Sequence, residues 1–192
     1  TLARSDLTVV VNSLDDGLPA IAARRRPGEL TSVTYLTQDI LDVRLRLSEP
    51  MNYYAGQYAN IGVPETDLIR SYSFATPSKV SSETNELSFH IKLIKEGQLS
   101  GWFRDNSRIG ESLTVDGPYG VFRIRNSQSP IVFIAGGSGM SPIKAILEES
   151  HENDSKRSAV YLYGARTQAD LYPQEIVAHL LDSWPGTLLY IP

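Results

Sequence analysis

The chain has 192 residues, of which 41% are hydrophobic and 21% are charged, and its formal net charge at pH 7 is −4. This composition is typical of a globular protein with a sizeable core, and the negative charge argues against general affinity for nucleic acid. No apolar stretch approaches the length of a transmembrane helix, so no membrane-spanning segment is expected. The absence of cysteine excludes disulfides, thiolate zinc sites and iron–sulfur clusters held by this chain, and it fits a reducing compartment such as the cytoplasm.

The first 28 residues predict a strand followed by a linker. Residues 1–11 (TLARSDLTVVV) lack the uninterrupted apolar core of a signal peptide and end in three valines, as the last strand of a preceding domain would. Residues 12–28 mix turn-forming and small residues with the basic run Arg24–Arg26 and Pro27, which favours a linker. We expect the arginines to be solvated, and docking of an acidic partner is the alternative.

Residues 29–127 are predicted to form an antiparallel β-barrel. Short runs that alternate or are continuously apolar follow one another: TSVTYLT, ILDVRLRLS, GQYANIGV, SYSFA, ELSFHIKLI, SLTVDG and VFRIR. In ILDVRLRLS an apolar residue takes every second position and charged residues lie between, which indicates a half-buried strand. GQLSGWFRD predicts one helical turn, and DGPYGVF predicts a turn that depends on glycine. Six or more short strands at this spacing favour a closed barrel.

Residues 128–192 predict the first part of an α/β domain. PIVFIAGG, SAVYLYGA and GTLLYIP predict buried strands, and SPIKAILEES and YPQEIVAHLLDSW predict amphipathic helices. Ser141 is expected to cap the first helix, with Pro142 in its first turn. The alternation predicts a parallel sheet with right-handed crossovers. Three strands make half of a doubly wound sheet and would leave an apolar edge, so we expect this domain to be incomplete.

A glycine-rich loop, AGGSGMSP, joins the first of these strands to the first helix. Gly136, Gly137 and Gly139 lack Cβ atoms, so a phosphate could approach the exposed N–H groups at the start of the helix. The alternative is a tight turn that binds no ligand.

The stretch RSYSFATP is unusually polar for a strand that ends at a proline. In an extended segment Arg70 and Tyr72 project from one face, and Ser71 and Ser73 from the other. A guanidinium suits a pyrophosphate, a tyrosine suits a planar ring, and Ser73 could donate to a ring nitrogen. A surface strand with an ion pair is the alternative.

One further stretch offers a candidate site, and the histidines offer none. In IKEGQLSGWF, Gly97 permits a turn and the N–H groups from Gln98 to Ser100 predict a second anion site, unless the segment is a plain connection. The histidines predict no site: they lie on a strand or on or beside helices, without Ser–His–Asp spacing or a metal-binding pair. We expect His90, His151 and His179 to be exposed or half-buried.

Together these motifs resemble the ferredoxin–NADP reductase superfamily, and more narrowly the FAD- and NADH-binding reductase components of bacterial multicomponent oxygenases. AGQYANI with RSYSFATP resembles the flavin strand pair, FHIKLIKEGQLSGWF the pyrophosphate segment and DGPYGVF the turn between domains. AGGSGMSP resembles the nucleotide phosphate loop and YGARTQADLY the ribose segment. The resemblance covers about residues 29–192, and residues 1–11 resemble the closing strand of a plant-type ferredoxin domain.

The resemblance implies a six-stranded Greek-key FAD-binding barrel, followed by an incomplete doubly wound NAD(P)H-binding domain, and no metal site in this chain. Arg70 would hold the FAD pyrophosphate, Tyr72 would stack beside the isoalloxazine, and Ser73 would hydrogen-bond near flavin N5; Tyr72 and Ser73 are the implied catalytic pair. The other implied FAD contacts are Ser71, the backbone of His90, Ile91 and Lys92, and Gly97, Gln98, Leu99 and Ser100. The implied nucleotide contacts are Gly136, Gly137, Ser138, Gly139, Gly164, Ala165, Arg166 and Asp170.

The implied activity is hydride transfer from NAD(P)H to FAD, after which single electrons pass through a 2Fe–2S cluster. The implied acceptor is an oxygenase or hydroxylase component, reached either directly or through a ferredoxin. Arg166 could attract a 2′-phosphate, which keeps NADPH as an alternative, although the resemblance favours NADH. The cluster cysteines and the family's Cys-Gly-x-Pro motif do not occur in this chain, so we expect FAD binding with poor NADH turnover. The alternatives are a cytochrome b5 reductase-type enzyme without a fused cluster, and a flavin- or nucleotide-binding regulatory module that transfers no electrons.

Overall fold

The structure is a computed structural model that describes residues 18–153 and 156–192. The strand expected at residues 1–11 and the start of the expected linker lie outside the described residues. The strands are β1 (Arg24–Tyr35), β2 (Ile40–Leu47), β3 (Tyr58–Gly62), β4 (Ile69–Ser73), β5 (Glu86–Lys92), β6 (Ser112–Tyr119), β7 (Ile131–Gly136), β8 (Ala159–Gly164) and β9 (Leu188–Ile191). The helices are α1 (Ser78–Thr84), α2 (Gln98–Trp102), α3 (Met140–Glu152) and α4 (Pro173–Leu181), with 3-10 turns η1 (Asn106–Arg108), η2 (Gly137–Gly139) and η3 (Gln168–Asp170).

The first six strands form the predicted barrel. They pair antiparallel in the order β4-β3-β6-β1-β2-β5, and a bridge between Phe74 and Phe89 brings the two outer strands together. Alternation dictates what lies inside: Leu41, Val43 and Leu45 of β2 are fully buried. Burying side chains of this size stabilises the fold by about 1.5–3 kcal/mol each. The barrel expected from the sequence is therefore confirmed.

The first strand begins earlier than expected. Arg24 to Glu29 of β1 pair with β6, so residues 24–28, expected in the linker, belong to the barrel. Pro27 is tolerated because β1 pairs with β2 only from Gly28 onward. At Pro27 the strand has β6 as its one neighbour, so no backbone N–H is needed to pair with β2.

Three further local expectations differ from the structure. Strand β6 continues through Asp116 to Tyr119, and the turn comes only at Gly120, whose φ is +90°. Residues 121–125, expected as a strand, form none. Helix α1 was not predicted, because its sequence SKVSSET has little apolar periodicity; it ends at Asn85, whose left-handed φ of 61° lets its N–H reach the Ser81 carbonyl.

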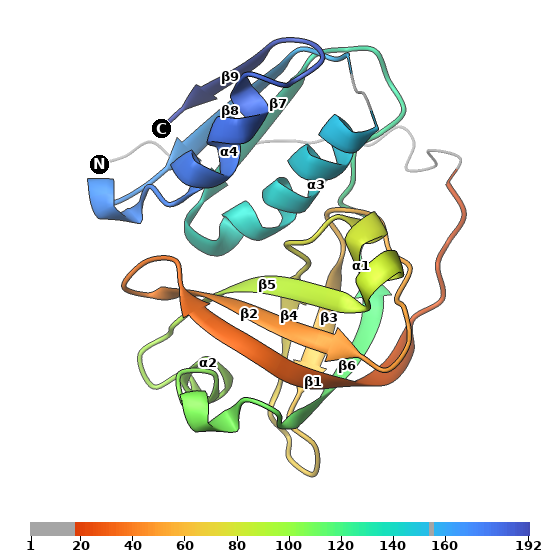
Figure 1. Ribbon diagram of the computed structural model, residues 1–192, viewed down its shortest axis with the longest axis vertical. Coiled ribbons are helices and arrows are strands. Elements are labelled where there is room, and N and C mark those ends of the chain that lie inside the picture. Colours follow the sequence, from red (N-terminus) through yellow and green to blue (C-terminus); the bar gives the residue numbers. More distant parts are fainter. Residues whose placement is uncertain (1–17, 154–155) are drawn as a thin grey trace, which may run out of the picture.

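The last three strands form a parallel sheet in the order β7-β8-β9, as predicted. Helices α3 and α4 pack against each other and share one core with buried Phe133 and Tyr161, so both cover the same face of the sheet (Figure 1). On the opposite face of β7 and β9, Val132, Ile134 and Leu189 are exposed. The described part of the sheet is therefore covered on one face only.

Helix α3 lies between this sheet and the barrel, with α1 beside it (Figure 1). Its expected cap is wrong: Gly139 occupies the N-cap position and Ser141 lies inside the first turn. The Ser141 hydroxyl instead donates to the Ser73 carbonyl at 2.7 Å and accepts the His90 N–H at 3.3 Å. Further along α3, Lys144 Nζ donates to the Ala75 carbonyl at 3.0 Å. The helix thus hydrogen-bonds the barrel at several points.

None of the helices within residues 18–153 and 156–192 has the length and apolar character needed to cross a bilayer.

Candidate cofactor and nucleotide site

Strand β4 presents the polar face that the sequence predicted. Arg70 is exposed, its Nη1 donates to the Ile69 carbonyl at 2.7 Å, and no carboxylate among the described residues forms an ion pair with it. Ser71 Oγ donates to Asn60 Oδ1 on the neighbouring strand at 2.7 Å. The alternative of a surface ion pair therefore finds no support, and most Arg70 donors are available to an anion.

Tyr72 is half-buried and rests edge-on against Phe103, with ring centroids 6.4 Å apart and planes at 74°. Burial is the main cause that raises the pKa of Tyr72 to about 12, so the phenol is neutral at physiological pH. The backbone carbonyl of the neighbouring Ser73 accepts a hydrogen bond from the Ser141 hydroxyl. The Ser73 side chain takes no part in that contact. The strand thus offers a cation, an aromatic ring and hydroxyls in sequence, a set that could hold a flavin dinucleotide.

In the segment from β5 to α2, two of the predicted residues point into the barrel core. The side chains of Ile91 and Leu99 are buried in the barrel core, so only their backbone could face a ligand. Ser100 Oγ accepts the Ile94 N–H at 3.2 Å, and a Cβ on Gly97 would lie 2.5 Å from that oxygen. Gly97 is therefore needed for the turn itself. The second anion site, including exposed Gln98, stays a prediction.

His90 corrects the expectation of exposed or half-buried histidines, because it is only 5% exposed. Its side chain points away from the barrel core. The alternation along β5 predicts solvent on that outer side, but the second half of the chain covers it. His90 Nδ1 lies 3.1 Å from the Tyr172 hydroxyl, which donates to the Gly137 carbonyl at 3.1 Å. Since a phenol has one proton and Gly137 receives it, we assign the His90 proton to Nδ1. The Tyr163 hydroxyl also donates to this carbonyl at 3.1 Å.

The glycine-rich loop leaves open space at Gly137. Gly137 has a left-handed φ of +54°, and no atom lies within 4 Å of where its Cβ would be. A Cβ on Gly136 would come within 3.1 Å of the Gly164 carbonyl on the neighbouring strand. Glycine is thus required at 137 by conformation and at 136 by close approach, and open space lies over the loop.

Beside this loop lies a cavity of about 210 Å³ that draws on both halves of the chain. Ligand pockets commonly measure about 300–1,000 Å³, so this one has room for part of a dinucleotide. Eight predicted site residues line it, and Asp39, Ile40 and Tyr163 were missed. The predicted residues are Lys92, Gly136, Gly137, Ser138, Gly164, Ala165, Arg166 and Asp170. Gly139, also predicted, forms the N-cap of α3 and does not line the cavity.

The cavity's charged side chains are paired with one another. Arg166 Nη2 lies 2.9 Å from Asp39 Oδ2, and Arg166 Nε lies 3.3 Å from Asp170 Oδ2. Lys92 Nζ lies 3.7 Å from the same Asp39 oxygen. Asp39 belongs to the hairpin between β1 and β2, and nothing in its sequence context indicates that the fold brings it to Arg166.

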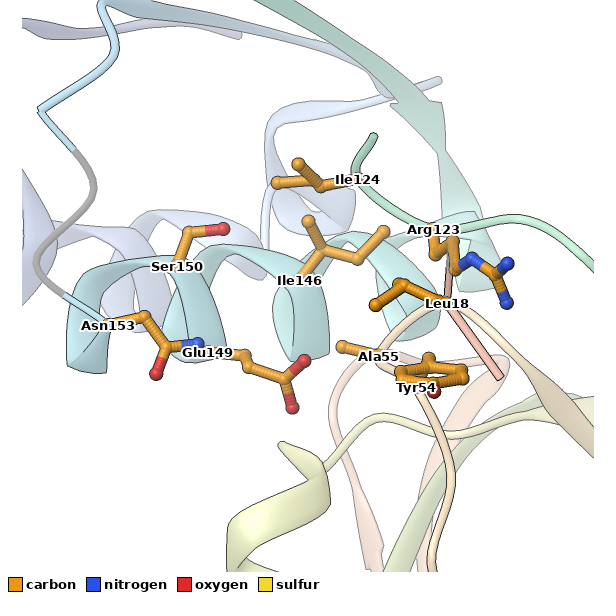
Figure 2. Close-up of a pocket in the computed structure, with 9 residues that line it drawn as sticks. All are labelled: Leu18, Tyr54, Ala55, Arg123, Ile124, Ile146, Glu149, Ser150 and Asn153. Carbon is orange, nitrogen blue, oxygen red and sulfur yellow. The ribbon is translucent and has the colours of Figure 1, made fainter. Parts of the chain in front are cut away.

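A second cavity, of about 240 Å³, lies between α3 and the barrel (Figure 2). Figure 2 shows Tyr54 and Arg123 on one side and Ile146 and Glu149 of α3 on the other. The Arg123 guanidinium stacks over the Tyr54 ring at 4.8 Å, and Glu149 accepts the Ser78 N–H at 2.9 Å. None of the predicted site residues lines this cavity, and the contact of Glu149 with Ser78 connects α3 to the barrel half of the chain.

Removing the Ser141 hydroxyl should weaken this junction. We expect Ser141→Ala to lower the free energy of unfolding by about 1–3 kcal/mol, because a buried hydroxyl that serves two backbone groups is lost. Urea unfolding measures the change. The control is Ser82→Ala in α1, whose exposed hydroxyl donates to the Lys79 carbonyl. An equal loss in both variants would show that the Ser141 bridge contributes nothing special.

Comparison with known proteins matches each half of the chain to a family. Residues 27–124, half of the chain, match the family described as oxidoreductase FAD-binding domain, and residues 133–192 match the oxidoreductase NAD-binding domain. The chain is 35% identical over 157 residues to the xylene/toluene monooxygenase electron transfer component of Pseudomonas putida, covering 82% of this chain and 44% of that protein. It is 34% identical over 167 residues to the phenol 2-monooxygenase reductase component of Pseudomonas sp. (strain CF600), covering 86% and 46%.

Solved structures show the same architecture. The Amycolatopsis cytochrome P450 reductase aligns with a TM-score of 0.79 at 28% identity, covering 88% of this chain and 51% of that one. The ferredoxin reductase in carbazole 1,9a-dioxygenase aligns with a TM-score of 0.77 at 28% identity, covering 92% and 52%. The chain spans about half the length of each of these four proteins. The chain therefore belongs to the oxidoreductase family that joins an FAD-binding barrel to an NAD-binding domain in the ferredoxin–NADP reductase-like fold.

Proposed function

We propose that this chain is the FAD- and NADH-binding part of an electron-transfer reductase that serves an oxygenase. The observation that carries the proposal is the Ser141 bridge. The first turn after the glycine-rich loop is hydrogen-bonded to Ser73, the last residue of the flavin strand. The loop expected to bind the nucleotide and the strand expected to bind the flavin therefore meet at one junction.

The residues divide the work of binding between the two halves. Arg70 offers its guanidinium to the FAD pyrophosphate, Tyr72 offers a neutral ring beside the isoalloxazine, and Ser73 offers a hydroxyl near flavin N5. In the second half, the open space over Gly137 leaves room for a nucleotide phosphate. When held by these residues, FAD would supply the chemistry of accepting a hydride from the nicotinamide and passing electrons on singly.

The proposed acceptor is a 2Fe–2S cluster in another domain or protein, because this chain has no cysteine to hold one. The matched relatives are named as components of xylene/toluene and phenol monooxygenases, which supports an oxygenase or hydroxylase as the final partner. The organic substrate is bound by that partner.

Anaerobic mixing of the FAD-loaded full-length protein with NADH tests this function. We expect the visible flavin absorbance to fall, and reduction of a one-electron acceptor such as cytochrome c to follow. A flavin that binds fully but is never bleached by NADH or NADPH would support the regulatory module instead. Bleaching in a full-length protein without a cluster would support the cytochrome b5 reductase type.

A further inference from the structure

The β1–β2 hairpin of the barrel reaches into the nucleotide cavity through Asp39. The hairpin fixes this residue: the Asp39 carbonyl accepts the Leu93 N–H at 2.7 Å, and the Asp39 N–H donates to Thr37 Oγ1 at 3.3 Å. The carboxylate projects from this anchored backbone to Arg166, which lies 127 positions away in the chain. Asp39 is therefore held in place by the FAD-binding half and forms an ion pair with the NAD-binding half.

Two carboxylates contact the Arg166 guanidinium, and both lie within hydrogen-bond distance of its Nη2. Asp39 accepts from Nη2 at 2.9 Å, and Asp170 lies 3.3 Å from Nε. An arginine beside the ribose site is the group that a 2′-phosphate needs. Here a 2′-phosphate would have to displace one carboxylate and remain close to two like charges. A ribose with a free 2′-hydroxyl can instead donate a hydrogen bond to such a carboxylate.

The ion pair of Lys92 also disfavours a ribose that carries a 2′-phosphate. Its ammonium lies 3.7 Å from Asp39, so this second cation of the cavity also has a carboxylate beside it. Across the lining, Asp39 and Asp170 balance Lys92 and Arg166, and the cavity carries no surplus positive charge. NADPH gains no electrostatic advantage over NADH in such a cavity.

We propose that Asp39 is a specificity-determining residue: together with Asp170 it occupies Arg166 and selects nucleotides that lack a 2′-phosphate. The inference rests on the proposed function, because it assumes that the cavity binds the adenosine ribose. Neither half of the chain alone sets this selectivity, since the barrel supplies one of the two carboxylates.

The test compares adenosine 5′-monophosphate with adenosine 2′,5′-bisphosphate by isothermal titration calorimetry on the full-length protein. Wild type should bind the monophosphate more tightly. In Asp39→Asn the affinity for the bisphosphate should rise on the order of tenfold, because one nearby negative charge and one competitor for Arg166 are gone. Asparagine retains the side-chain oxygen that contacts Thr37, so the hairpin should keep its fold. The gain should shrink at high salt.

The matched control is Glu86→Gln, which removes one carboxylate from an ion pair with Arg46 at the other end of the β2–β5 pair. It should leave both affinities unchanged. In the double variant Asp39→Asn, Arg166→Gln most of the gain should disappear. Monophosphate binding with an unchanged affinity ratio in Asp39→Asn would overturn the role of Asp39 and leave the proposed function standing. If neither nucleotide binds wild type, the proposed use of NADH fails and the inference fails with it.

Discussion

Replacing Arg70 with alanine is expected to raise the Kd for FAD by about two orders of magnitude. A hydrogen bond to a charged group contributes about 1.5–3 kcal/mol, and a guanidinium binds a pyrophosphate through two such bonds. A loss of about 3 kcal/mol corresponds to roughly 100-fold in Kd. Because Arg70 is exposed and has no ion-pair partner among the described residues, the fold itself should lose little stability.

Fluorescence titration of the FAD-free protein measures this Kd. Arg46→Ala is the matched control, because Arg46 is another exposed barrel arginine, paired with Glu86 at 3.0 Å. It should leave the Kd within about twofold, as surface ion pairs contribute little. Arg70→Lys should fall between wild type and alanine, since it retains the charge without the planar fork. An unchanged Kd in Arg70→Ala would remove Arg70 from the pyrophosphate site.

Acid should destabilise the protein through His90. Burial is the main cause that lowers the pKa of His90 from 6.5 to about 4; nearby Asp42 opposes the shift, and Lys144 and Arg44 add to it. Between these two values the unfolded chain binds a proton that the folded protein does not, so stability falls as the pH drops. From pH 7 to pH 5 this single group should cost about 2 kcal/mol.

Urea unfolding at pH 7 and pH 5 checks the prediction in wild type and in His90→Gln. Glutamine retains a donor for Tyr172 but does not titrate, so the variant should lose about 2 kcal/mol less than wild type over this interval. The control Gln128→Ala replaces an exposed side chain that cannot titrate and should retain the wild-type pH dependence. The same loss in His90→Gln as in wild type would show that His90 does not titrate in this way.

Local patterns predicted much of the fold and part of the site. Strand β2 was predictable because an apolar residue at every second position must face one side, and the glycine-rich loop because it joins a buried strand to a helix. Cavity residues such as Arg166 and Asp170 were found through motif resemblance, and the cavity brings them together. Whether Arg70 and Ser73 contact a flavin stays a prediction.

The missed features depend on contacts between distant parts of the chain. Alternation places His90 outside the barrel, and only the second half of the chain buries it. Ser141 is a good cap by local chemistry, but the nearby Ser73 carbonyl takes its hydroxyl. Asp39 lies in an ordinary hairpin, and its partner comes from the other half. No local pattern encodes these pairings, because each needs two segments to be positioned by the whole fold.

The way the barrel meets its neighbour also constrains how such proteins could be recombined. A chimera that kept this barrel and took its nucleotide-binding half from a relative would leave an imidazole facing a foreign surface. The incoming half would need a hydroxyl at position 141 and a phenol at position 172 to replace the partners lost from His90. The two halves can therefore be exchanged between relatives only together with the residues that line the interface between them.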